Sequence, residues 1–157
     1  MGKSLKRVKA HIAALGLDLT ILEVTVPTNT AQQAADALGC GVDQIVKSVI
    51  FCGAHTGKAI LFLTSGSNRV DVEAASALAG QPLGKADAAL IRAQTGFAIG
   101  GVSPFGHLNQ IQTFMDRHLL DHGILWAAAG TPHHMFDISP NVLADKTNAQ
   151  VANFTET

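Results

Sequence analysis

Two apolar runs in the middle of the chain constrain its fold more than any other feature. They are Val46-Lys47-Ser48-Val49-Ile50-Phe51-Cys52 and Ala59-Ile60-Leu61-Phe62-Leu63-Thr64, and a turn that contains Gly53 and Gly57 separates them. Their β-branched and aromatic residues favour extended strands. Because the connection is short, we expect the two runs to pair as a central antiparallel hairpin.

Helices and shorter strands are expected on both sides of this hairpin. Leu5, Val8 and Ile12 recur at the spacing of an amphipathic helix. Ser4 is its candidate N-cap, and Gly16 is its stop. From Asn141 to Thr157 the chain is polar. The pattern also predicts helices between Thr30 and Gly39, Asp71 and Gly80, and Asp87 and Gly96, and strands over Thr20–Val26 (closed by Pro27), Ile111–Met115, Gly123–Ala129 and Met135–Ile138.

The length and the order of these elements predict one domain. A chain of 157 residues can bury a sizeable core, and it contains no repeat, linker or low-complexity tract. We therefore expect a single α/β domain of the α+β type over residues 1–157, with a curved, mostly antiparallel or mixed sheet and flanking helices. The alternation is too irregular for a doubly wound parallel fold, and neither GxxxxGK[ST] nor GxGxxG is present.

Composition excludes several classes of function. The formal net charge of -1 excludes a broad grip on a polyanion, so any contact with RNA must be local. Cys40 and Cys52 form no CxxC pair and the seven histidines lack HExxH spacing, so we expect neither a metal site nor a cofactor. No apolar run approaches the ~20 residues that span a bilayer, and the N-terminus lacks a signal-peptide core. These features predict a cytoplasmic protein without membrane contact.

The stretch from Thr95 to His107 is the first candidate for a functional site. Its sequence, TGFAIGGVSPFGH, opens like a buried strand, breaks at Gly100-Gly101 and stops at Pro104. Glycines at such a point let main-chain amides approach a ligand, as in an oxyanion or anion pocket. An ordinary strand end with a Gly-Gly turn would have the same pattern, so that alternative stays open.

Lys47 is the second candidate. On a strand it shares a face with Val49 and Phe51, so we expect its stem to be packed and its ammonium to emerge at the end of the sheet. Beside a glycine turn, such an ammonium can clamp a phosphate or a carboxylate. The alternative is a lysine at the strand edge that reaches into water.

Ser103 and His133 are weaker candidates. A nucleophile elbow requires GxSxG, but Phe105 occupies the last position and Pro104 removes an amide. Ser103 is therefore structural or contacts substrate, and it is not a nucleophile. His133 follows the turn Gly130-Thr131-Pro132, so it, or the histidine after it, is a candidate site residue with a titratable ring. A solvated loop histidine is the alternative.

Five sequence blocks carry a further signal, and they follow one another from about Thr30 to the last strand. They are Thr30 to Gly39, Ile45-Val46-Lys47-Ser48, Ser65-Gly66-Ser67-Asn68-Arg69-Val70-Asp71, Thr95 to Gly106, and Ala129-Gly130-Thr131-Pro132-His133. Together they resemble the YbaK/ProX family of free-standing aminoacyl-tRNA deacylases, which is similar to the editing domain of bacterial prolyl-tRNA synthetases.

The resemblance implies hydrolysis of the ester that joins a wrong amino acid to the terminal ribose of tRNA. In the family, the matching lysine is thought to hold the phosphate of the terminal adenosine, the glycine loop to position the carbonyl, and a ribose hydroxyl to help activate water. The residues implied here are Lys47, Gly100 and Gly101 as catalytic, and Val102, Ser103, Pro104 and His133 as substrate-binding.

The leading hypothesis is a trans-editing hydrolase. It would remove a small amino acid, namely alanine, serine or threonine, from the acceptor end of mischarged tRNA, with an aminoacyl-tRNA synthetase as an optional partner. Cysteine is not assigned, because family members that act on cysteinyl-tRNA tend to carry a different segment in place of Gly130-Thr131-Pro132-His133. Two alternatives are a non-catalytic module that binds aminoacyl-tRNA or an RNA end, and a small-molecule ester or amide hydrolase.

Overall fold

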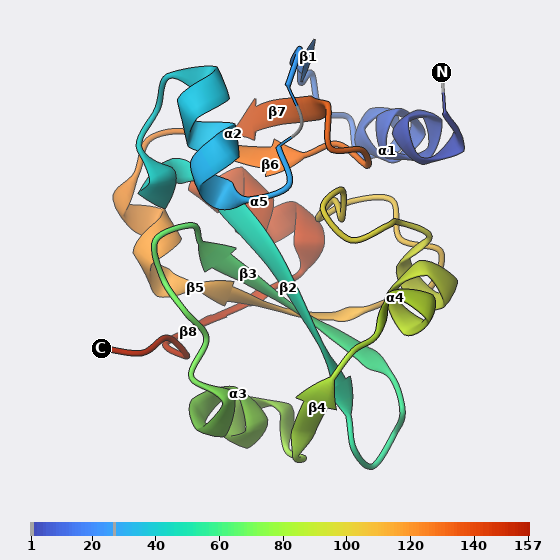
Figure 1. The fold of residues 1–157 in the computed structure, drawn as a ribbon, viewed down its shortest axis with the longest axis vertical. Helices are drawn as coiled ribbons and strands as arrows, with labels where there is room; N and C mark the ends of the chain where they lie inside the picture. Colours follow the sequence, from blue (N-terminus) through green and yellow to red (C-terminus); the bar gives the residue numbers. More distant parts are fainter. Residues whose placement is uncertain (1, 27) are drawn as a thin grey trace.

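The central hairpin is present in the computed structural model, which describes residues 2–26 and 28–157 (Figure 1). Strands β2 (Val46–Gly53) and β3 (Ala59–Ser65) pair antiparallel, with Val49 opposite Phe62. This pairing confirms the prediction made from the two apolar runs. Pro27, the predicted end of the first strand, lies outside the described residues.

The strands form two sheets instead of one. The larger sheet has the order β4-β2-β3-β5-β8; β3 and β5 pair parallel, as do β5 and β8, while the other neighbours are antiparallel. The smaller antiparallel sheet has the order β1-β7-β6. The α+β class with a mixed sheet is confirmed. The remaining strands are β1 (Ile21–Glu23), β4 (Leu83–Lys85), β5 (Gln112–Asp116), β6 (Leu125–Ala128), β7 (His134–Ile138) and β8 (Gln150–Ala152).

Capping residues set most helix boundaries as predicted. The side chains of Thr30, Asp71 and Asp87 accept hydrogen bonds from backbone N–H groups in the first turns of α2, α3 and α4. The first helix differs, because its N-cap is Gly2. Ser4 lies inside the helix, and its hydroxyl donates to the carbonyl of Gly96 at 3.4 Å. The helices are α1 (Lys3–Ala14), α2 (Ala31–Leu38), α3 (Val72–Ala79), α4 (Ala88–Thr95) and α5 (Pro140–Thr147), with 3-10 turns η1 (Val42–Gln44) and η2 (Arg117–Asp121).

No helix or strand was predicted from Asn141 to Thr157, where the chain is polar, but the structure has both there. This segment forms α5 and then β8, which extends the larger sheet. Ser139 caps α5 with its hydroxyl, Pro140 occupies the first turn, and Asn148 ends the helix with a φ of 55°. This is a regular start and stop signal for a helix, and it outweighs the polar composition.

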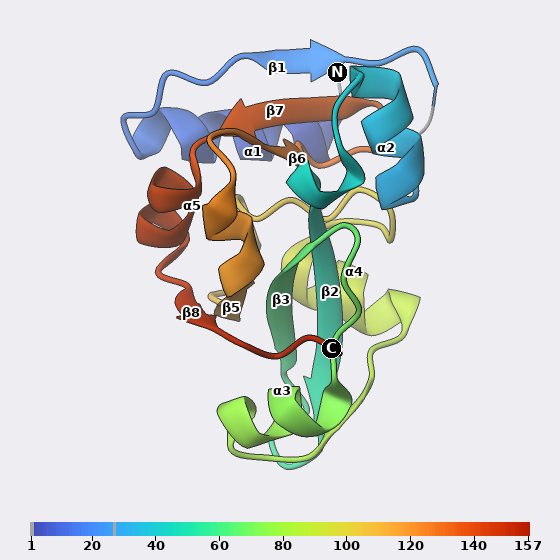
Figure 2. The same ribbon diagram turned by 90° about the vertical axis from the view of Figure 1, so that its left-hand side faces the viewer.

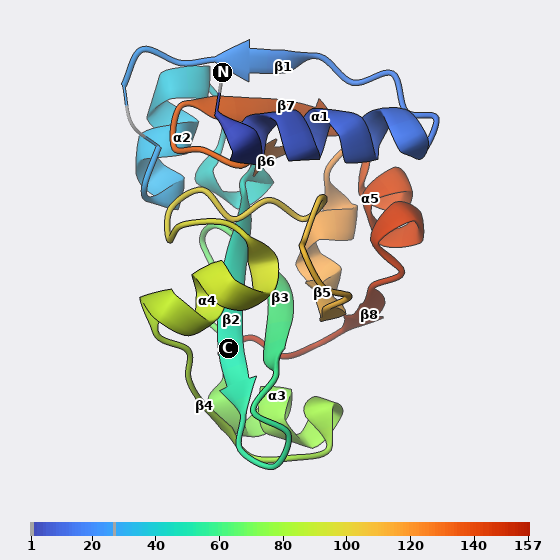
Figure 3. The same ribbon diagram turned by 90° about the vertical axis from the view of Figure 1, so that its right-hand side faces the viewer.

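The prediction that Thr95–His107 opens with a buried strand is also wrong. After α4 the chain continues as a loop with no regular secondary structure until β5, and Figure 3 shows it crossing between α1 and α4. Phe97, Val102 and Phe105 are buried in the same core cluster. Their burial explains why the sequence imitates a strand.

The two faces of the β2–β3 hairpin bury different cores. Leu61 and Leu63 face the main cluster, which includes residues of α1 and of the Thr95–His107 loop. Phe62 faces a second cluster, stacked on Phe114 with ring centroids 5.1 Å apart. The smaller sheet and α1 lie at one end of the molecule, and α3 and the β2–β3 turn lie at the other (Figure 2).

Candidate functional site

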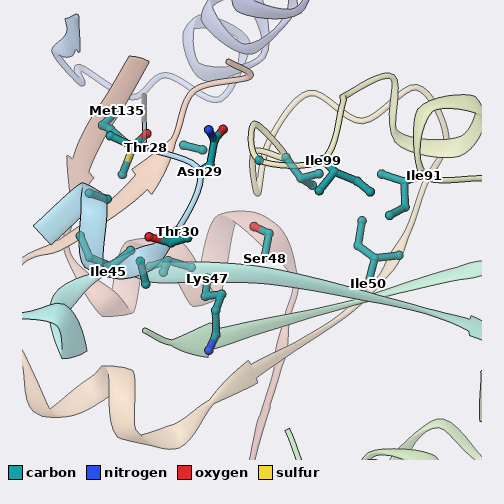
Figure 4. Close-up of a pocket in the computed structure, with 16 residues that line it drawn as sticks. Thr28, Asn29, Thr30, Ile45, Lys47, Ser48, Ile50, Ile91, Ile99 and Met135 are labelled. Atoms are coloured by element: carbon teal, nitrogen blue, oxygen red, sulfur yellow. The ribbon is translucent and has the colours of Figure 1, made fainter. Parts of the chain in front are cut away.

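A small cavity lies where the start of β2, the segment before α2 and the Thr95–His107 loop meet (Figure 4). Its volume is about 190 Å³. Asn29 and Ser48 lie between two apolar groups of side chains, with Ile45 and Met135 on one side and Ile50, Ile91 and Ile99 on the other. The cavity therefore suits a small ligand that carries both polar and apolar groups.

Asn29 and Ser48 are the polar side chains free to bind a ligand. The hydroxyl of Thr28 donates to the carbonyl of Pro132 at 2.8 Å, and the hydroxyl of Thr30 accepts from the backbone of α2. By contrast, the Ser48 hydroxyl and the Asn29 carboxamide have no hydrogen-bond partner among the described residues. The sequence analysis missed both residues.

The glycine turn forms one wall of the cavity. The amide of Gly101 donates to the carbonyl of Ala98 at 3.1 Å, and Gly100 has a φ of 91°, as the third position of a type II turn requires. Gly101 therefore cannot supply a free amide. The amides of Gly100 and Val102, two residues that line the cavity, find no acceptor within the described part of the chain.

Gly100 and Gly101 must each be glycine for a different structural reason. The positive φ of Gly100 strains any other residue, and a Cβ there would lie 2.9 Å from Oδ1 of Asn29. Gly101 is buried, and a Cβ there would lie 2.9 Å from the Cα of Thr131. Gly101 thus allows the turn to pack against the backbone of the Gly130–Pro132 turn.

The expectation that the Lys47 ammonium lies beside the glycine turn is wrong. Only part of Lys47 lines the cavity, because its side chain extends from the opposite face of β2 to that of Ser48 (Figure 4). Its Nζ donates to the carbonyl of Asn68 at 2.6 Å. Burial lowers the pKa of the Lys47 ammonium, repulsion from Arg69 lowers it further, and Asp116 acts in the opposite direction.

Ser103, Pro104 and His133 lie outside the residues that line the cavity. Ser103 is fully buried; its hydroxyl accepts from the amide of Phe105 at 3.1 Å, which is a structural role. The amide of His133 donates to the hydroxyl of Thr131 at 3.1 Å, and its Nδ1 lies 3.2 Å from the carbonyl of Val24. Of the predicted site residues, the cavity brings together Lys47, Gly100 and Val102.

The cavity is lined by no acidic side chain and no histidine. Its one ionisable lining residue is Lys47, whose Nζ is bonded to the carbonyl of Asn68 on the face of β2 opposite Ser48. Across the described residues there is no group of three or more His, Cys, Asp or Glu that could hold a metal ion. None of the helices described is long and apolar enough to cross a membrane.

Known proteins are similar to this chain in structure or in sequence. A solved structure titled "Crystal structure of a putative trans-editing enzyme for prolyl tRNA synthetase" superposes with a TM-score of 0.92 at 42% identity, over 100% of this chain and 99% of that one. YwhH of Bacillus subtilis (strain 168) is 26% identical over 148 residues, 94% of each chain.

The name of a further relative describes a tRNA deacylase. "Putative Cys-tRNA(Pro)/Cys-tRNA(Cys) deacylase EbsC" of Enterococcus faecalis (strain ATCC 700802 / V583) is 24% identical over 127 residues, 80% of this chain and 77% of that protein. The family model of the aminoacyl-tRNA editing domain matches residues 25–146 of this chain. Every residue that lines the cavity lies within this range. This chain is therefore a member of the aminoacyl-tRNA editing domain family.

Proposed function

We propose that this protein hydrolyses the ester bond of mischarged aminoacyl-tRNA and that the amino acid is small, of the alanine, serine or threonine class. The observation that carries the proposal is the pair of unengaged amides, on Gly100 and Val102, in the wall of a cavity whose other polar groups are Asn29 and Ser48. Amides of this kind stabilise the oxyanion that forms when an ester is attacked.

The reaction needs no protein nucleophile. Water adds to the carbonyl carbon, the bond from that carbon to the ribose oxygen breaks, and the ribose oxygen takes up a proton. The free amino acid and the uncharged tRNA are the products. Because the cavity lacks a carboxylate and an imidazole, the proton must leave the water through a substrate hydroxyl or solvent. Positioning and the two amides would supply the acceleration.

The size of the cavity supports a small amino acid. Its volume, about 190 Å³, is below the ~300–1,000 Å³ of pockets that enclose drug-sized ligands. Ile50, Ile91 and Ile99 supply a contact for a short apolar side chain, and Ser48 supplies one for a hydroxyl or an amino group. One methylene changes discrimination by only ~1–3 kcal/mol, so the enzyme should accept several small residues.

Lys47 is proposed to contact the phosphate of the terminal nucleotide outside the cavity, on the face of β2 opposite Ser48. The nucleotide would reach this face around the edge of the strand, because at Lys47 β2 pairs with β3 on one side and its pairing with β4 begins only at Phe51. An ammonium has three N–H donors, and here one of them bonds the carbonyl of Asn68. We also propose that Val102 acts through its amide, that Ser103 and Pro104 shape the loop, and that His133 fixes the turn behind Gly101. The protein would act in the cytoplasm on mischarged tRNA, with or without a synthetase partner.

The test is release of amino acid from a panel of tRNAs charged with alanine, serine, threonine, cysteine or proline. We expect release of alanine, serine or threonine and slow release of proline. Fast release of proline or cysteine alone would overturn the assigned amino acid class. Hydrolysis of free esters, with no release from any tRNA, would favour a small-molecule hydrolase.

A binding module is the second candidate function. The lack of a carboxylate and an imidazole in the cavity lining is the observation that favours it. Tight binding of charged tRNA with no release from any member of the panel would establish this function in place of hydrolysis.

A further inference from the structure

A second and larger hollow lies beside the later part of the Thr95–His107 loop, at Pro104, Phe105 and His107. It is a groove of about 1360 Å³ that runs from the end of α1, at His11 and Leu15, to the β2–β3 turn, at Thr56 and Lys58. The elements along it can be followed in Figure 3. Its far wall comes from β5 and from the end of α5.

The groove is lined by apolar side chains, such as Leu15, Leu108 and Ile111, together with polar side chains that carry no negative charge. The groove contains no acidic side chain, although the chain has twelve, and its cations are Lys58 and Lys146. Lys146 lies 3.9 Å from Asp145, an exposed ion pair of the kind that contributes little and can exchange partners. Amides supply most of the remaining polar groups, among them Gln94, Asn109, Gln110, Gln112, Asn148 and Gln150.

This combination fits a polynucleotide strand. Ammonium groups neutralise phosphates, while amides can both donate to phosphate and sugar oxygens and pair with the edges of bases. Gln110, Gln112 and Gln150 are exposed, so their side chains are accessible. Because no carboxylate lines the groove, no side chain there would repel a phosphate group.

One loop, Thr95–His107, lines both the cavity and the groove, with different residues. Ile99, Gly100 and Val102 line the cavity, and the same loop continues through Pro104 and His107 to line the groove. One strand could therefore place its end in the cavity while its preceding nucleotides lie along the groove. We propose that the groove, through Lys58 and Lys146, binds the RNA of the tRNA outside its charged end; the identity of this RNA rests on the proposed function.

The test measures binding of uncharged tRNA at several salt concentrations. The variant is the double substitution Lys58→Gln and Lys146→Gln, and the control is Lys3→Gln and Lys85→Gln, which changes the charge equally at exposed lysines outside both hollows. We expect the groove variant to bind about tenfold or more weakly. The slope of log Kobs against log salt should fall by about 0.7–0.9 per lysine, with little change in the control.

Hydrolysis of a 3′-aminoacyl adenosine separates the groove from the cavity. The groove variant should cleave this small ester at the wild-type rate but cleave charged tRNA more slowly at limiting concentration. Equal binding losses in both double variants, or no loss in the groove variant, would overturn the proposal. If the wild type cleaves no ester while tRNA binding still depends on Lys58 and Lys146, hydrolysis is wrong and the groove assignment stands.

Discussion

At the scale of single residues, Ser48 offers the cleanest test of the cavity. Its hydroxyl is directed into the cavity and has no partner among the described residues. Ser48→Ala should therefore leave the thermal midpoint nearly unchanged. It should lower deacylation by up to about tenfold, the value of one ordinary hydrogen bond of ~0.5–1.5 kcal/mol. Ser67→Ala, at an exposed position, is the control. Equal rates in Ser48→Ala and wild type would remove Ser48 from the site.

Lys47→Ala tests the proposed contact with phosphate. A charge-assisted hydrogen bond contributes ~1.5–3 kcal/mol, so we expect deacylation to fall by about tenfold or more. Loss of the bond to Asn68 should also lower the thermal midpoint, so both quantities must be measured. A lower midpoint with a wild-type rate would show that Lys47 only supports the strand end.

The sequence identified residues near the site, but it did not predict which of their groups face the cavity. Lys47 and Ser48 are neighbours on a strand, so their side chains point to opposite faces. Only one of the two could therefore face the cavity. The sequence could not show which face meets the glycine turn, because that depends on how a loop fifty residues later packs. Gly101 was predicted to act through its amide, but the amide is engaged with Ala98.

At the scale of elements, α1 holds the loop that forms the cavity wall. The Nε of Arg7 donates to the carbonyl of Gly106 at 2.6 Å, Nη2 lies 3.5 Å from the carbonyl of Thr95, and the guanidinium carbon lies 4.7 Å from the centre of the Phe97 ring. Arg7 thus ties together both ends of the loop. Helix α1 precedes residues 25–146, which match the family model. The contacts that Arg7 makes with the loop therefore come from outside the matched residues.

Arg7→Met should destabilise the fold by about 1–3 kcal/mol, since it leaves two carbonyls without their charged donor. Chemical denaturation measures this change in the free energy of unfolding. Lys6→Met, at an exposed position on the same helix, should change it by less than about 0.5 kcal/mol. Equal stability of the two variants would show that the loop does not need α1.

His107 makes the loop sensitive to acid. Burial lowers the pKa of His107; the bond from its Nε2 to the carbonyl of Ser103, 2.7 Å away, opposes this shift, and the nearby His11 and Arg7 reinforce it. The folded protein therefore binds fewer protons at this group than the unfolded chain, whose histidines titrate near ~6.5. Stability should fall as the pH drops below about 6.5 and level off below the folded pKa.

The pH profile of the free energy of unfolding, for wild type and for His107→Gln, isolates this contribution. The difference in the free energy of unfolding between the two proteins should shrink as the pH falls from about 7 to 5, because only the wild type loses stability by protonation of the His107 ring. A difference that stays constant over that range would contradict the assignment of the effect to His107.

Helix caps and loops differ in how far sequence predicts them. Thr30, Asp71 and Asp87 cap their helices as predicted, because a cap and a glycine stop act within a few residues. The loop after α4 was mistaken for a strand, because Phe97, Val102 and Phe105 are buried through distant contacts. Periodicity cannot distinguish such a loop from a short buried strand.

At the scale of the whole molecule, charge is distributed in a way that net charge conceals. The chain has a formal net charge of -1, yet none of its twelve acidic residues lines the cavity or the groove. The balance of charges predicts that any contact with RNA is local, but it cannot show that two hollows are lined by no carboxylate. That arrangement arises only when distant segments fold against each other.

The most direct test of the central claim compares deacylation of alanyl-, seryl- and threonyl-tRNA by wild type, Gly100→Ala and Gly80→Ala. Gly100 and Gly80 have φ values of 91° and 73°, so alanine strains both positions, but Gly80 ends α3 with no heavy atom within 4 Å of an added Cβ. Gly100→Ala should lose about tenfold or more of the activity, because the turn that carries the free amides is displaced. Gly80→Ala should lose stability and keep its rate. Equal rates in the two variants would contradict a catalytic role for the glycine turn.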